Sequence, residues 1–151
     1  LGTRQALSQQ APAAVPLATP LMLETAIAAG QAPEMQALLQ AHYAQAPSLD
    51  VLEGIVALQA LNPTDAATAR QWYVRHLDKE QSLVAAAKWL AEEKLEHEEF
   101  HPQIQRALDH AVKPLTRYRC AACGFEARQH FWQCPGCQTW DSYPARRVEE
   151  L

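Results

Sequence analysis

The chain has 151 residues, of which 48% are hydrophobic and 20% charged, with a net charge of −4 at pH 7. This composition is that of a globular protein and excludes a disordered chain. The negative balance gives no electrostatic footprint for nucleic acid. No apolar run reaches the length of a transmembrane helix, and residues 1–20 lack the layout of a signal peptide.

The first residues, from Leu1 to Gln10, read as the end of a helix and do not begin with Met. We therefore expect an excised fragment that is soluble by itself. Any targeting or anchoring segment would lie upstream of Leu1.

Between Leu21 and Val112, apolar residues recur at helical spacing, while Gly and Pro fall almost only between the periodic stretches. Thr19 and Pro20 have the form of an N-cap followed by Pro at N1, which predicts a first helix that ends near Gly30. Its apolar positions would be Leu21, Leu23 and Ile27. Five more helices are expected to begin at Pro33, after Ser48, after Asn62–Asp65, after Ser82 (continuing through Leu95) and at His101.

The helix start signals repeat along the chain. Ser48-Leu49 and Ser82-Leu83 lie 34 residues apart, the period of tetratricopeptide (TPR) helix pairs. The pattern predicts a mainly α fold, a TPR-like array of about three hairpins, with an ordinary six-helix bundle as the alternative. An array would leave a concave peptide-binding face, with candidates in residues 49–61 and 83–95. Trp72 and Trp89 are interpreted as packing residues.

The acidic stretch near residue 98 contains Glu98-x-x-His101, which resembles half of a carboxylate-bridged di-iron site. No second Glu-x-x-His is present, so a solvated helix end is the favoured interpretation. No Gly-rich phosphate loop, Gly-x-Ser-x-Gly elbow or His-Glu-x-x-His occurs either. The sequence therefore predicts no catalytic residue and no enzyme.

All four cysteines form two Cys-x-x-Cys pairs separated by ten residues: Cys120, Cys123, Cys134 and Cys137. Each pair can form a knuckle, and two knuckles complete the tetrahedral four-sulfur shell of a structural zinc or rubredoxin-type iron site. Their confinement to this motif indicates metal and a reducing compartment rather than disulfides. We predict these four residues as ligands of one metal ion, zinc or iron.

After Pro114 the helical period ends, which divides the chain into a helical domain, residues 1–114, and a metal-binding domain, residues 115–151. Aromatic-rich runs at 117–120, 125–133 and 139–143 predict a small β-ribbon. So small a module needs the metal for much of its folding energy. Arg119 or Arg128, with backbone N–H groups, is expected to offset thiolate charge. The expected apolar wall, part of it packed on the helices, comprises Phe125, Phe131, Trp132, Trp140 and Tyr143.

The string Tyr118-x-Cys120-x-x-Cys123-Gly124-Phe125-x-Ala127, followed by Trp132-x-Cys134-Pro135-x-Cys137-x-x-Trp140, resembles the C-terminal rubredoxin-like domain of the LapB (YciM) family. In that family the domain follows TPR repeats. The resemblance implies a non-enzymatic adaptor in lipopolysaccharide assembly that promotes degradation of LpxC by the FtsH protease. It also implies other envelope-assembly partners and a place on the cytoplasmic face of the bacterial inner membrane, through an anchor absent from this chain.

Three other functions are weighed against the adaptor. A rubredoxin-type electron-transfer protein shares the same knuckles. A nucleic-acid-binding zinc ribbon is disfavoured because residues 115–151 hold five Arg and four acidic side chains. A sugar transferase has no room for its catalytic domain. The partner-binding residues stay unknown at this point.

Overall fold

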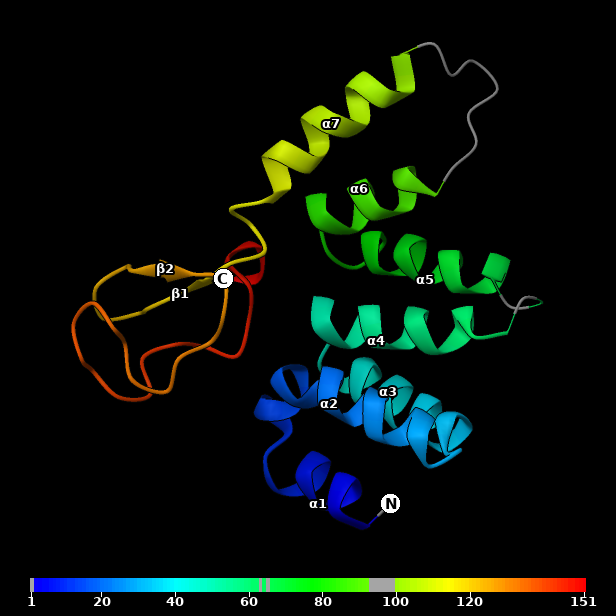
Figure 1. Cartoon of the computed structure of the whole chain (residues 1–151), viewed down its shortest axis with the longest axis horizontal. Helices are drawn as coiled ribbons and strands as arrows, with labels where there is room; N and C mark the ends of the chain where they lie inside the picture. The colour runs from blue at the N-terminus through cyan, green and yellow to red at the C-terminus, as the bar shows by residue number, and fades with distance from the viewer. Residues whose placement is uncertain (1, 63, 65, 93–99) are drawn as a thin grey trace. The chain divides into compact units, whose positions relative to one another are not determined.

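The computed structural model describes residues 2–62, 64, 66–92 and 100–151. They are mainly helical, with a small two-stranded sheet (Figure 1). The helices are α1 (Gly2–Gln10), α2 (Val15–Ala28), α3 (Ala32–Gln45), α4 (Leu49–Ala60), α5 (Ala66–Leu77), α6 (Leu83–Ala91) and α7 (His101–Val112). The strands are β1 (Tyr118–Arg119) and β2 (Glu126–Ala127), and two 3-10 turns are η1 (Pro12–Ala14) and η4 (Val148–Glu150).

The helix starts follow the period read from the sequence. Helices α2, α4 and α6 begin 34 residues apart, and α3 and α5 also begin 34 residues apart. Helix α7 begins 35 residues after α5. This confirms a mainly α chain of three helix pairs followed by the cysteine-containing module. The chain divides into two compact units, residues 1–72 and 73–151, with the boundary inside α5.

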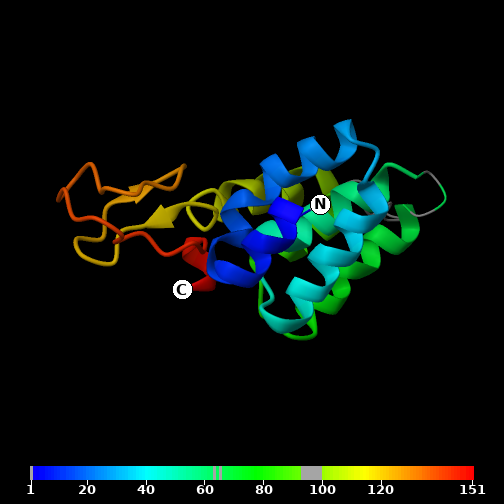
Figure 2. The same cartoon turned by 90° about the horizontal axis from the view of Figure 1, so that it is seen from below.

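The first unit is built around α4, which packs on both α2 and α3. Figures 1 and 2 show α2 and α3 side by side as a hairpin. The largest fully buried side chains of the first unit are Val15, Leu39, Val51, Leu52 and Ile55. Trp72 meets Tyr43 edge to face, with ring centroids 5.7 Å apart, which agrees with a packing role for this tryptophan.

The predicted start of the first long helix is wrong. Helix α2 begins at Val15, and Pro20 lies inside it. Thr19 is buried, and its hydroxyl donates to the Val15 carbonyl at 2.9 Å rather than capping a helix. The buried face of α2 also differs from the apolar positions predicted, because its packing on α4 and α3 decides which side is covered: Met22 and Ala26 are in the core, whereas Leu21 and Ile27 are 65% and 49% exposed.

The two predicted serine caps are confirmed. Ser48 Oγ accepts from Val51 N at the start of α4, and Ser82 Oγ accepts from Ala85 N at 2.9 Å at the start of α6. Such caps satisfy backbone N–H groups that have no partner within the helix.

Helix α4 is too buried to supply much of a partner face. Eight of its residues are buried, from Leu49 through Leu58. The packing is close at Gly54, where an added Cβ would lie 2.6 Å from Thr19 Cγ2 in α2. The groove candidates among residues 49–61 are therefore limited to the exposed and half-buried positions of this segment, and the groove itself stays a prediction.

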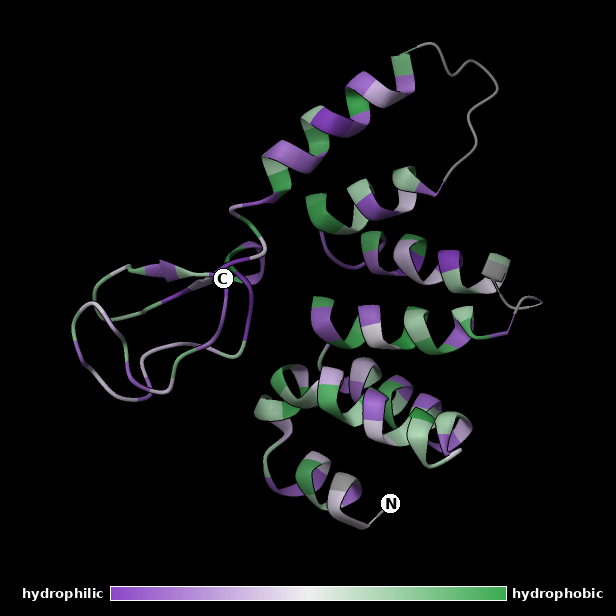
Figure 3. Ribbon diagram, in the orientation of Figure 1, coloured by the Kyte–Doolittle hydropathy of each residue, from purple (hydrophilic) through white to green (hydrophobic). Residues whose placement is uncertain are grey.

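In the second unit, α6 ends at Ala91 and packs on α7. The predicted continuation through Leu95 falls outside the described residues. Figure 3 shows hydrophobic and hydrophilic residues alternating along α7, which has no buried residue. Over the described part of the chain, no helix has the length and apolar character needed to span a membrane.

The β-ribbon is shorter than the aromatic runs suggest. Strands β1 and β2 pair antiparallel, with Tyr118 opposite Ala127 and Arg119 opposite Glu126. One isolated antiparallel bridge joins Gln133 to Trp140. Because two-residue strands bury little apolar surface, other interactions must hold the module together.

Candidate metal centre

The two knuckles have the same backbone design. In the first, Gly124 N donates to Cys120 O at 2.9 Å, and Cys120 N donates to Phe125 O at 2.9 Å. In the second, Gln138 N donates to Cys134 O at 2.8 Å, and Cys134 N donates to Thr139 O at 2.9 Å.

Each turn requires a left-handed residue directly after its second cysteine. Gly124 has φ 77° and Gln138 has φ 59°. Glycine adopts this conformation without strain, whereas glutamine does not. The second knuckle thus carries a backbone cost that the first avoids.

The backbone turns bring four sulfur atoms together. All four lie within 4.8 Å of one another, with Cys120 Sγ 3.8 Å from Cys137 Sγ and Cys123 Sγ 3.7 Å from Cys134 Sγ. A tetrahedral metal with bonds of about 2.3 Å places its sulfurs about 3.8 Å apart. The four cysteines are free thiols. Their arrangement fits one zinc or iron ion, both of which thiolates bind well.

Two hydroxyl side chains contact the sulfurs. Ser142 Oγ lies 3.2 Å from Cys120 Sγ, and Thr139 Oγ1 lies 3.3 Å from Cys137 Sγ. Gly136 N donates to Cys134 Sγ at 3.4 Å. As thiols, Cys120 and Cys137 donate to these hydroxyl oxygens, and Ser142 donates to Thr139 O. Once the sulfurs are thiolates, the hydroxyls can donate to them instead and so, with the Gly136 N–H, offset their negative charge. Sequence analysis missed Ser142 and Thr139, although hydroxyl residues two and five positions after Cys137 are a readable signal.

The same contacts perturb the thiols. The Ser142 hydrogen bond is the main cause that lowers the pKa of Cys120 to about 6, and Thr139 lowers the pKa of Cys137. A backbone hydrogen bond at Phe125 acts to lower the pKa of Cys123, but burial and the neighbouring sulfurs outweigh it and raise this pKa to about 12. Cys120 and Cys137 thus lose their protons more readily than Cys123. A metal ion that binds all four sulfurs must displace the protons that remain.

Tyr143 ties the second knuckle to the first. Its hydroxyl donates to Phe125 O at 3.0 Å and lies 4.0 Å from Cys134 Sγ. Burial raises the pKa of Tyr143 to about 12, so the phenol stays protonated and keeps its donor. The side chain is buried, as expected for the apolar wall.

The segment that contains the four cysteines is similar to known proteins. Residues 118–143 match the family model Zn_ribbon_LapB, described as a rubredoxin metal binding domain. The four-cysteine module is thus similar to the rubredoxin-like domain of LapB proteins over residues 118–143. Lipopolysaccharide assembly protein B of Escherichia coli (strain K12) is 42% identical over 41 residues, which cover 26% of this chain and 10% of that protein. The Haemophilus influenzae protein of the same name is 31% identical over 39 residues, with the same coverage.

The LapB-type module does not bury all its aromatic side chains. Trp132 and Trp140 are 62% and 65% exposed, and Phe125 is also exposed. The expected apolar wall is therefore wrong for these three residues. The interior is instead formed by Tyr118 and Tyr143, with the His130 ring edge-on to both.

The charged residues of the LapB-type module are placed differently from expectation. Arg119 makes two hydrogen bonds to Glu126 Oε1, at 2.9 and 2.7 Å, across the β1–β2 pair. Its partner is thus a carboxylate, and the contacts that reach the sulfurs come from hydroxyls and a backbone N–H. His101, from the rejected di-iron motif, lies 3.2 Å from Leu90 O through Nε2. Glu98 is outside the described residues.

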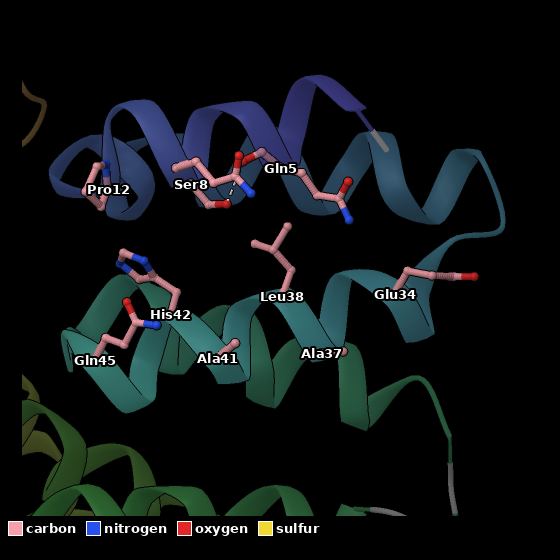
Figure 4. Close-up of a pocket in the computed structure, with 10 residues that line it drawn as sticks. Gln5, Ser8, Pro12, Glu34, Ala37, Leu38, Ala41, His42 and Gln45 are labelled. Carbon is pink, nitrogen blue, oxygen red and sulfur yellow. Dashed lines mark hydrogen bonds between the residues drawn. The ribbon is translucent and has the colours of Figure 1, made fainter.

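The first unit contains a separate pocket of about 650 Å³ between α1 and α3 (Figure 4). Gln5 and Ser8 come from α1, whereas Leu38, His42 and Gln45 come from α3. Burial lowers the pKa of His42. Among the described residues, none of 49–61 or 83–92 lines this pocket, so it differs from the groove predicted from the sequence.

Proposed function

We propose that Cys120, Cys123, Cys134 and Cys137 bind one structural metal ion, zinc or iron. The mutual approach of the four sulfurs supports this site, as does the match to a metal-binding domain. The ion would supply the folding energy that two short strands cannot. We also propose the domain division 1–114 and 115–151, with TPR-type stacking of the helix pairs supported by their 34-residue period.

The function we propose is that of a non-enzymatic adaptor in lipopolysaccharide assembly. The observation that carries it is the match of the metal module to proteins named lipopolysaccharide assembly protein B. The matched segment spans 10% of the length of these relatives. The role of the whole protein is therefore inferred through this module, with the helix pairs as the protein-binding part.

The finer proposal concerns partners and location. The adaptor would bring LpxC to the FtsH protease at the cytoplasmic face of the inner membrane. Other envelope-assembly proteins would also be among its partners. Attachment to the membrane would come from a segment upstream of the present chain. Nucleic acid is not a proposed partner because the module lacks a basic stripe.

Electron transfer by a rubredoxin-type iron is the less favoured function. The matched relatives are named for assembly rather than for redox chemistry. The two functions differ in what the metal must do. An adaptor needs a closed four-sulfur shell of either metal, whereas an electron carrier needs iron that changes oxidation state.

The test is complementation of a bacterium depleted of its own LapB-type protein, using a membrane-anchored protein that contains this chain. The wild-type protein should restore the normal lipopolysaccharide level and shorten the half-life of LpxC, and Cys134→Ser should do neither. Gln138→Gly serves as the matched control, since it keeps all four ligands. An unchanged lipopolysaccharide level with wild-type protein would refute the assembly role, and an unchanged LpxC half-life would refute the proteolytic step alone. Activity with iron but not with zinc would favour electron transfer.

A further inference from the structure

The C-terminal segment, residues 144–151, folds back on the chain that leads into the metal module. Val148 N donates to Arg117 O at 2.7 Å, and Glu149 N donates to Leu115 O at 3.2 Å. Figure 1 shows this segment, in red, beside the strand region. The entry to the first knuckle and the exit from the second are therefore held together.

Arg147 strengthens this attachment. Its guanidinium donates to Thr116 O at 2.8 Å and lies 4.3 Å from the centre of the Tyr118 ring. Tyr118 is buried and begins β1, two residues before Cys120. The position of the C-terminal segment thus depends on the fold of the module that the metal would stabilise.

The side chain of Glu149 leaves the segment and reaches the start of α6. Its Oε1 accepts from Leu83 N at 2.5 Å and from Val84 N at 3.0 Å. Its Oε2 accepts from the Ser82 hydroxyl at 2.7 Å. A carboxylate here binds N–H groups that lack partners within the helix and complements the positive end of the helix dipole.

Helix α6 therefore receives part of its N-terminal cap from a residue more than sixty positions away. Ser82 alone satisfies Ala85 N, while the N–H groups of Leu83 and Val84 depend on Glu149. If the module unfolds, the anchors at Arg117 and Thr116 are lost, and Glu149 no longer has a fixed position at the helix.

We propose that the C-terminal segment transmits metal occupancy of the four-cysteine site to the N-terminal turn of α6 through the Glu149 carboxylate. The metal-loaded module holds Glu149 on the helix, and the metal-free module releases it. Because coupling is reciprocal, loss of the Glu149 contact also weakens metal binding by the same factor. The coupling requires an occupied metal site and does not depend on the identity of any partner.

The test is amide hydrogen exchange of the full chain, loaded with zinc and after its removal by a chelator. In the wild-type chain, removal of zinc should speed exchange at Leu83 and Val84 by about tenfold. Glu149→Ala should show the fast rate even with zinc bound, and zinc removal should change it little further. Glu24→Ala is the matched control, because it removes an exposed carboxylate of α2 in the first unit.

Metal affinity provides a second readout in case a variant loses zinc. Competition with a chelator should show weaker zinc binding by about tenfold in Glu149→Ala, with a smaller change of the same sign in Glu149→Gln and none in Glu24→Ala. The proposal is overturned if zinc removal leaves exchange at Leu83 and Val84 unchanged in the wild-type chain. It is equally overturned if Glu149→Ala keeps wild-type exchange and zinc affinity.

Discussion

Gly54 lies where α4 packs closely on α2 and α3, so Gly54→Ala should destabilise the first unit. The added Cβ would lie 2.6 Å from Thr19 Cγ2 and 3.1 Å from Leu39 Cδ1. Both neighbours are fully or nearly fully buried, and Thr19 is held by its hydrogen bond to Val15 O. Neither side chain can move away freely.

The magnitude follows from two opposing effects. Overpacking a buried contact costs about 1–3 kcal/mol, while replacing Gly by Ala within a helix gains about 1 kcal/mol. The net loss in the free energy of unfolding should be about 1 kcal/mol. Thr19→Ser removes the clashing methyl but keeps the hydroxyl, so the double variant should recover most of this loss.

Urea denaturation followed by far-ultraviolet circular dichroism measures these differences. Gly2→Ala is the control, because its added Cβ meets no atom within 4 Å. The packing argument would fail if Gly54→Ala were as stable as the wild-type chain. It would also fail if the effects of Gly54→Ala and Thr19→Ser simply added, since residues in contact should couple.

Three further predictions concern the module and the buried histidine. Cys134→Ser should abolish stoichiometric metal binding and the near-ultraviolet dichroism of the module, whereas unchanged metal content would contradict a four-cysteine site. Gln138→Gly should raise the thermal stability of the metal-loaded module by about 0.5–1 kcal/mol because it relieves a left-handed φ; a loss of stability would refute this. Burial lowers the pKa of His42, so the folded chain binds its proton less readily than the unfolded chain. The free energy of unfolding should therefore fall as pH drops below about 6.5, and His42→Gln should reduce that fall in urea titrations at several pH values.

The sequence predicted those features whose cause is local. Ser48 and Ser82 identify the starts of α4 and α6 because a capping hydroxyl acts within three residues of itself. The cysteine spacing predicts the clustered sulfurs for the same reason, since each knuckle closes within a few residues.

Predictions failed where the same local sequence pattern is compatible with more than one structure. Thr19-Pro20 has the pattern of a helix start, yet the chain is already helical from Val15. Pro20 lies in the helix interior, where it has no N–H to donate to the carbonyl four residues earlier, and the Thr19 hydroxyl donates to the Val15 carbonyl instead of capping a helix. Packing of α2 on α4 and α3 decides which of its residues face the core, so the exposure of Leu21 and Ile27 could not be read from periodicity alone.

Long-range contacts lay beyond sequence reasoning altogether. The bonds from Leu83 and Val84 to Glu149 span more than sixty residues, and no composition or spacing signal connects those positions. The exposure of Trp132 and Trp140 is a similar case, because two-residue strands offer too little surface to cover them.

Elemental analysis with an absorbance spectrum on natively purified protein tests the central claim most directly. The account predicts one zinc or iron ion per chain, lost in Cys134→Ser and retained in Gln138→Gly. A natively purified wild-type chain that carries four titratable thiols and no bound metal would contradict it.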